Sequence, residues 1–176
     1  MANRVAIREL QNRLASRLLA ARTQGVSVSW LAVKAGGSNY LFPLSQSGEI
    51  FPLANLQPVP YCRSWFSGVV NLRGGLFGVV DLAGFLAEGQ PPTRSEQSIS
   101  EASVVTLNAA LDVNCALMVD GLAGLRSVEA FVASEPPATD APIYFGNRYT
   151  DSSSQMWQEI NLQALSLFPQ FLSISA

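Results

Sequence analysis

The segment from Gly68 to Leu82 (GVVNLRGGLFGVVDL) constrains the fold more than any other part of the chain. Two apolar runs rich in β-branched residues flank a charged glycine turn, Arg73-Gly74-Gly75. Apolar runs bounded by glycine are typical of strands, and an X-Gly-Gly link between two strands is typical of a β-hairpin. The segment therefore predicts a hairpin that carries Arg73 at or beside its turn, where Asn71 can hydrogen-bond the turn backbone.

The chain from residue 26 onward shows the same alternation of short apolar runs and turn residues, which predicts an all-β fold. Residues 90–100 (QPPTRSEQSIS) have the composition of a polar loop. Residues 80–85 and 160–165 share the form apolar-[Asp/Asn]-Leu-x-x-apolar after a strand-like run. This similarity predicts two related units, in each of which Asp81 or Asn161 caps a short helical turn.

Residues 1–25 predict an amphipathic helix, with Asn3 as its N-cap and Gly25 at its end. This segment holds five of the eleven basic residues of the chain but a single acidic one. A basic helix of this kind can bind a membrane surface or an acidic partner, or it can pack its apolar stripe on its own domain. Because the apolar face is modest, packing is the favoured interpretation. The stripe consists of Ile7, Leu10, Leu14, Leu18 and Ala21.

The chain contains no histidine, which excludes histidine-based acid–base catalysis, histidine metal sites and phosphohistidine transfer. Cys62 and Cys115 are 53 positions apart and match neither a metal-binding nor a redox spacing, so we expect reduced structural cysteines. Residues 74–78 are rich in glycine but lack the ending of a phosphate-binding loop. No paired carboxylates and no G-x-S-x-G motif are present. We therefore expect no enzyme, no cofactor and no metal.

Composition narrows the possible partners. The net charge of −2 and the pI near 5.1 argue against a general nucleic-acid binder. Hydrophobic residues make up 48% of the chain and charged residues only 14%, so we expect partners to cover some apolar surface. No apolar run approaches the ~18 residues of a membrane span, and the N-terminus lacks the apolar region of a signal peptide. The sequence predicts a cytoplasmic protein without membrane insertion.

GVVNLRG followed by VVDL resembles the signature of CheW-like domains, the adaptors that couple bacterial chemoreceptors to the histidine kinase CheA. Tyr40–Leu44, Glu49-Ile50, Val59-Pro60 and Ala116–Gly121 are similar to further family segments, so the resemblance covers roughly residues 30–167. It implies an all-β fold with two small five-stranded SH3-like barrels around a shared core. We expect this domain to span residues 26–176, with a polar loop at about 87–100, after the N-terminal helix.

The resemblance implies a non-catalytic adaptor recruited to membrane-associated receptor arrays. Its partners would be the regulatory domain of a CheA-like histidine kinase and the cytoplasmic tip of a methyl-accepting chemoreceptor. In this family the glutamate of the Glu-Ile pair and the arginine of NLRG are important polar positions that can face each other across the first barrel. The alternative is an ordinary exposed ion pair. The implied partner-binding residues are Glu49, Ile50, Asn71, Leu72, Arg73, Gly74, Val79 and Asp81.

An apolar groove between the barrels is also implied, as the site that holds the receptor helix. We expect a minority of the apolar residues in the matching segments to line it and the rest to be core. Asp81 is better explained as a cap than as a partner contact, and Asp120 fits a turn equally well. The apolar residues are Ile50, Leu72, Val79, Val80 and Val119.

The longer N-terminus resembles the PilI-type branch of the family, which serves type IV pilus twitching motility; a flagellar chemotaxis adaptor is the alternative. Asn161 departs from the Asp-Leu pair that is common at this point in the family. Two rival classes stay open. An SH3-like or OB-like module could bind another peptide or a nucleic acid, although the acidic pI opposes the latter. A histidine-free enzyme would need a clustered acid pair that the sequence does not show.

Overall fold

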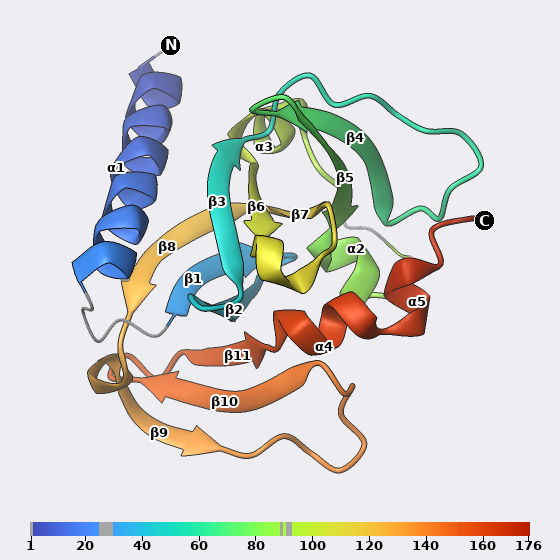
Figure 1. Cartoon of the computed structure of the whole chain (residues 1–176). Helices are drawn as coiled ribbons and strands as arrows, with labels where there is room; N and C mark the ends of the chain where they lie inside the picture. The colour runs from blue at the N-terminus through green and yellow to red at the C-terminus, as the bar shows by residue number, and fades with distance from the viewer. Residues whose placement is uncertain (1, 25–29, 89, 91–92) are drawn as a thin grey trace.

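The computed structural model describes residues 2–24, 30–88, 90 and 93–176, which form two β-sheets with short helices at their ends and a long helix at one side (Figure 1). The helices are α1 (Ala2–Gln24), α2 (Leu82–Leu86), α3 (Glu96–Glu101), α4 (Leu162–Leu167) and α5 (Pro169–Leu172). Single 3-10 turns occupy Ala109–Leu111 and Val128–Ala130. The strands are β1 (Trp30–Ala35), β2 (Ser38–Pro43), β3 (Ser47–Pro52), β4 (Phe66–Leu72), β5 (Gly75–Asp81), β6 (Ser103–Leu107), β7 (Cys115–Val119), β8 (Gly121–Arg126), β9 (Phe131–Glu135), β10 (Phe145–Asp151) and β11 (Met156–Ile160).

The two sheets repeat one arrangement. The first has the order β8-β1-β2-β11-β10-β9 and the second the order β3-β6-β7-β5-β4. In each, one parallel pair, β2 with β11 or β7 with β5, joins two groups of antiparallel strands. A short helix follows the equivalent strand in each unit, α4 after β11 and α2 after β5. The predicted all-β fold of two related units is confirmed, and the first sheet carries a sixth strand, β9.

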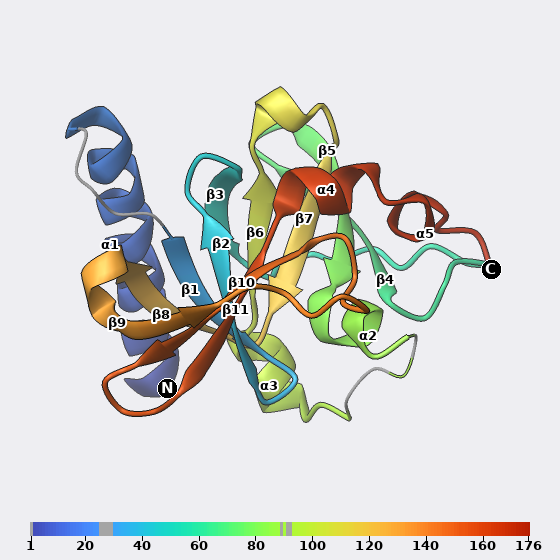
Figure 2. The same cartoon turned by 90° about the horizontal axis from the view of Figure 1, so that it is seen from below.

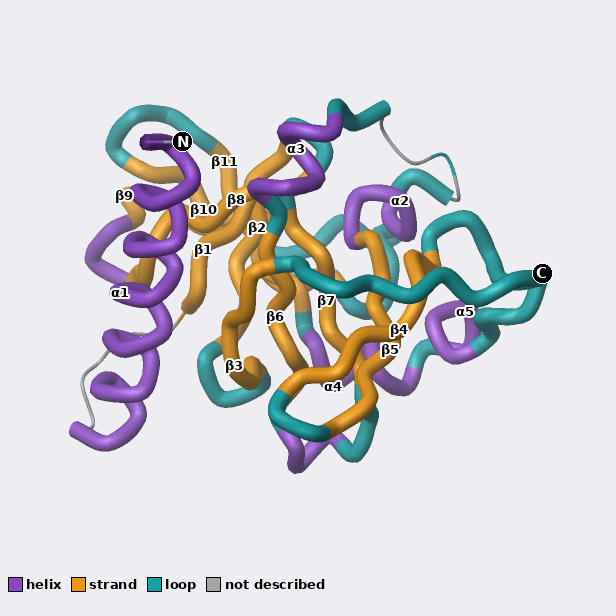
Figure 3. Tube along the Cα trace, turned by 90° about the horizontal axis from the view of Figure 1, so that it is seen from above, coloured by secondary structure: helices purple, strands orange, loops and turns teal. Residues whose placement is uncertain are grey.

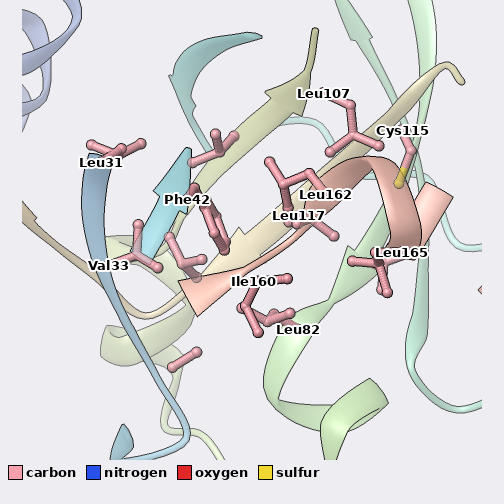
Figure 4. Close-up of a cluster of buried hydrophobic side chains, with 14 of the residues drawn as sticks. Leu31, Val33, Phe42, Leu82, Leu107, Cys115, Leu117, Ile160, Leu162 and Leu165 are labelled. Carbon is pink, nitrogen blue, oxygen red and sulfur yellow. The ribbon is translucent and has the colours of Figure 1, made fainter. Parts of the chain in front are cut away.

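The largest core cluster lies between the two sheets and joins them. Figure 4 shows members of this cluster from both sheets, with Phe42 of the first sheet and Leu117 of the second near its centre and Leu162 and Leu165 of α4 beside them. Smaller clusters fill the other face of each sheet, one around Trp30 and Trp157 and one of mainly small aliphatic side chains. Because the central strands are buried on both faces, they read as continuous apolar runs and not as alternating ones.

Helix α1 contacts β3 and β8, which are one edge strand of each sheet, and it lies along one side of the molecule (Figure 3). Leu14 and Leu18 are buried in the shared core, which confirms that the helix packs on its own domain. The predicted stripe is wrong at Leu10, which is exposed, because the buried position belongs to Gln11, whose side-chain amide donates to the Ser103 hydroxyl. The helix already includes Asn3, so this residue is not an N-cap. The side chain of Ala21, and Gly25, lie outside the described residues.

The segment expected to be a polar loop contains α3, whose first turn is capped where the Ser95 hydroxyl accepts a hydrogen bond from the Ser98 amide at 3.1 Å. The chain ends lie on opposite sides of the molecule (Figure 2). Among the described residues, no helix has the length and apolar character needed to cross a membrane.

Candidate partner-binding site

The β4–β5 hairpin ends in a two-residue turn. Leu72 pairs with Gly75, which leaves Arg73 and Gly74 in the loop with φ angles of 51° and 80°. Positive φ at both positions is the geometry of a type I′ turn, whose twist matches that of the paired strands. The Asn71 carboxamide oxygen accepts a hydrogen bond from the Gly74 amide at 3.0 Å. The predicted hairpin and the predicted role of Asn71 are both confirmed.

Arg73 forms an ion pair with Glu49 of the neighbouring part of β3. The Arg73 Nη2 atom lies 3.2 Å from Glu49 Oε2, and the guanidinium carbon lies 5.8 Å from the centroid of the Phe51 ring. The Glu49 amide donates to the Thr106 hydroxyl at 2.7 Å, which fixes the backbone beneath the carboxylate. The two side chains are 70% and 40% exposed, so the pair adds only ~0–1 kcal/mol to stability. Its geometry therefore displays an ordered cation and carboxylate on the surface.

A groove of about 570 Å³ runs beside this pair, between the hairpin, β3 and the β6–β7 connection. Its lining combines the ion pair with apolar side chains and with polar side chains of the β6–β7 connection. Such a surface can hold a protein segment through apolar contacts while charged groups at the edge select its orientation. The residues that line it include Glu49, Phe51, Leu72, Arg73, Phe77, Asn108, Asp112 and Asn114.

The structure separates the other predicted site residues into surface and interior. Asn71 and Gly74 are exposed at the hairpin turn, whereas Ile50 and Leu72 are buried, and Leu72 also lines the groove. Val79 and Asp81 are 0% and 3% exposed. These two side chains therefore lie in the interior of the chain, whereas partner contact at the predicted positions stays a prediction. Val80 and Val119 are likewise core residues.

Asp81 also departs from its predicted role as a cap. It occupies the N-cap position of α2, but its side chain makes no capping hydrogen bond. Instead, both carboxylate oxygens accept hydrogen bonds from the Arg94 guanidinium, one from Nη1 and one from Nη2 at 2.9 Å. This pairing raises the pKa of Arg94, so the guanidinium stays charged. Asn161, at the equivalent position before α4, does cap its helix by accepting from the Ala164 amide at 3.0 Å.

Arg94 was not singled out from the sequence, although one signal was available. It is the single basic residue between Arg73 and Arg126, within a segment rich in acidic residues. In the structure its Nε atom also donates to Asp120 Oδ1 at 2.7 Å, and Asp120 Oδ2 accepts from the Gly36 amide at 2.7 Å. Asp120 therefore links the Arg94 guanidinium to the Gly36 amide, in addition to its place in a turn.

The cysteines and acidic residues show no sign of a reactive centre in the part of the chain that the structure describes. Cys62 and Cys115 are free, and burial raises the pKa of the Cys115 thiol to about 12. No group of three or more potential metal ligands occurs among the described residues.

Comparison with known proteins gives three consistent similarities. A family model described as the CheW-like domain matches residues 29–166. Protein PilI of Pseudomonas aeruginosa is 29% identical over 167 residues, which cover 93% of this chain and 89% of that protein. The crystal structure of the scaffolding protein TtCheW from Thermoanaerobacter tengcongensis has a similar fold, with a TM-score of 0.59 and 16% identity over 77% of this chain and 89% of that one.

Proposed function

Because this chain belongs to the CheW-like domain family, we propose that it is a non-catalytic adaptor that couples methyl-accepting chemoreceptors to a CheA-like histidine kinase. The observation that carries this proposal is the Glu49–Arg73 ion pair at the edge of the groove, in the hairpin that carries the NLRG sequence. The pair adds little to stability, so a role in displaying charge to a partner accounts better for its ordered geometry. The fold shared with a scaffolding protein supports the same role.

The adaptor would act by holding kinase and receptor together in one assembly. Simultaneous binding raises the local concentration of the kinase at the receptor. A change in the state of the receptor would shift the conformational equilibrium of the kinase. The coupling free energy between two such sites is typically about 1–3 kcal/mol in allosteric systems. The partner segment in this proposal is a helix that places apolar side chains in the groove beside Arg73 and a charge against the ion pair. This role would recruit the protein to membrane-associated receptor arrays.

Control of type IV pilus twitching motility is the output that we propose, because the similarity to protein PilI extends over 93% of this chain. Flagellar chemotaxis is the alternative output. Deletion of the gene in its own host separates them: we expect smaller twitching zones with unchanged swimming. Loss of swimming with normal twitching would exclude the pilus assignment while leaving the adaptor role intact.

Calorimetric titration with the regulatory domain of the host's CheA-like kinase, and separately with a receptor cytoplasmic fragment, tests the adaptor role. We expect saturable one-to-one binding that Arg73→Glu weakens by about tenfold or more, since the displayed cation would be lost and a like charge would face Glu49. Arg148→Glu is the matched control, because Arg148 is exposed on β10 of the other sheet. Circular dichroism should show both variants folded. Absence of binding by the folded wild-type protein to both partners would refute the adaptor role.

A charge exchange identifies what Arg73 does at the interface. The double variant Glu49→Arg/Arg73→Glu restores the ion pair with its direction reversed. Recovery of binding would show that the pair matters for the shape of the surface. Continued weakness would show that the partner contacts the Arg73 charge directly.

A further inference from the structure

The two sheets meet closely where the β1–β2 turn of the first sheet lies against α2, which follows β5 of the second. Gly36 in this turn has a φ of +58°, and a Cβ atom added there would lie 2.9 Å from the Cβ of Ala83 in α2. Since this is well inside normal carbon–carbon contact, only glycine allows the turn to approach the helix this closely. The turn and the helix therefore form a tight joint between the sheets.

Arg94 links the two sides of this joint through charged hydrogen bonds. Its guanidinium binds Asp81, at the end of β5, through two nitrogens, and it binds Asp120, at the start of β8, through a third. Asp120 in turn accepts from the Gly36 amide in the β1–β2 turn. The Arg94 side chain is 10% exposed and that of Asp81 is 4% exposed, so solvent screens this connection weakly. The Glu49–Arg73 pair, in contrast, lies within the second sheet alone.

We propose that Arg94 is a positioning residue that fixes the angle between the two sheets. The apolar core between the sheets holds them together, but apolar contacts are non-directional and tolerate sliding. A planar guanidinium that binds one carboxylate with two nitrogens and a second carboxylate with the third allows little rotation about the joint. Segment 93–95, which carries Arg94, thereby sets how the six-stranded and five-stranded sheets face a partner that touches both. This inference does not rest on the proposed adaptor role, because every test uses the isolated protein.

Residual dipolar couplings of the backbone amides measure the angle directly. One alignment tensor should fit the amides of both sheets in the wild-type protein. In Arg94→Lys, which keeps the charge and loses the planar fork, we expect the sheets to need different tensors or show unequal order. Arg148→Lys is the matched control and should behave as the wild type. A single tensor identical to that of the wild type in Arg94→Lys would overturn the proposal.

Hydrogen exchange and chemical rescue provide a second measurement. In Arg94→Ala the Gly36 amide should exchange about tenfold faster or more relative to the Val105 amide, which reports opening of the second sheet. A guanidinium salt, well below denaturing concentration, should restore Gly36 protection, whereas sodium chloride at equal ionic strength should not. Equal acceleration at Gly36 and Val105, or rescue by both salts, would show that Arg94 contributes only general stability. If Arg94→Ala does not fold, the Arg94→Lys measurements decide.

Discussion

The buried Asp81–Arg94 pair and the exposed Glu49–Arg73 pair should respond very differently to loss of the arginine. Arg94→Ala leaves the Asp81 carboxylate in the interior without its counter-charge, because its side chain is only 4% exposed and Arg94 donates to both of its oxygens. Removing one partner of a buried pair typically costs about 3–5 kcal/mol of unfolding free energy. For Arg73→Ala, at a side chain that is 70% exposed, we expect ~0–1 kcal/mol.

A double variant tests the reason for this difference. If the cost in Arg94→Ala comes from the uncompensated carboxylate, then removing that carboxylate as well should recover part of the stability. We therefore expect Arg94→Ala/Asp81→Ala to be more stable than Arg94→Ala alone, with a coupling free energy of at least about 1 kcal/mol. Asp120 remains solvated in both variants because its side chain is 32% exposed.

Urea unfolding followed by circular dichroism measures these free energies. The unfolding transitions are comparable when the slope of the unfolding free energy against urea concentration is the same for each variant. The reasoning fails if Arg94→Ala costs no more than Arg73→Ala, or if the double variant is less stable than Arg94→Ala. Either result would mean that water or another group solvates Asp81 when Arg94 is removed.

Two further predictions concern the N-cap of α4 and the buried thiol. Asn161→Ala should cost about 0.5–2 kcal/mol in urea unfolding because the Ala164 amide loses its acceptor, whereas Asn161→Asp should stay near the wild type; equal losses in both variants would contradict the capping role. Burial raises the pKa of Cys115 from 9.0 to about 12, so the folded state keeps its proton while the unfolded state ionises. Stability should therefore fall as pH rises from about 9 to about 12, and fall less steeply in Cys115→Ala; identical pH profiles would argue against a buried, protonated thiol.

Much of the second sheet could be predicted from short stretches of sequence. Asn71, Arg73 and Gly74 determine a type I′ turn because the chemistry of the turn is contained in the turn residues themselves. The two short helices after β5 and β11 could also be predicted from local sequence, because each begins within a few residues of the end of its strand. The Glu49–Arg73 pair required the family resemblance, because nothing local connects residues 24 positions apart.

The interior assignments could not be made from the pattern alone. Strands buried on both faces carry apolar residues at successive positions, so alternation does not distinguish a groove residue from a core residue. This is why the sequence left open whether Val79 is a core residue or a groove residue, whereas the structure buries it completely. Leu10 was misplaced for a related reason: the helix presents Gln11 inward because Ser103 supplies a partner for its amide.

The sequence by itself determined the class of fold, the two related units and the displayed hairpin, because turn chemistry and strand propensity act over a few neighbouring residues. Only the tertiary structure decided what the carboxylates do. Asp81 can equally cap a helix or pair with an arginine, and it pairs because Arg94, 13 residues away, reaches both of its oxygens. Asp120 joins the same network across 26 residues to Arg94 and 84 residues to Gly36. Such a choice depends on which groups the folded chain brings together and shields from water, and no local pattern of residues contains that information.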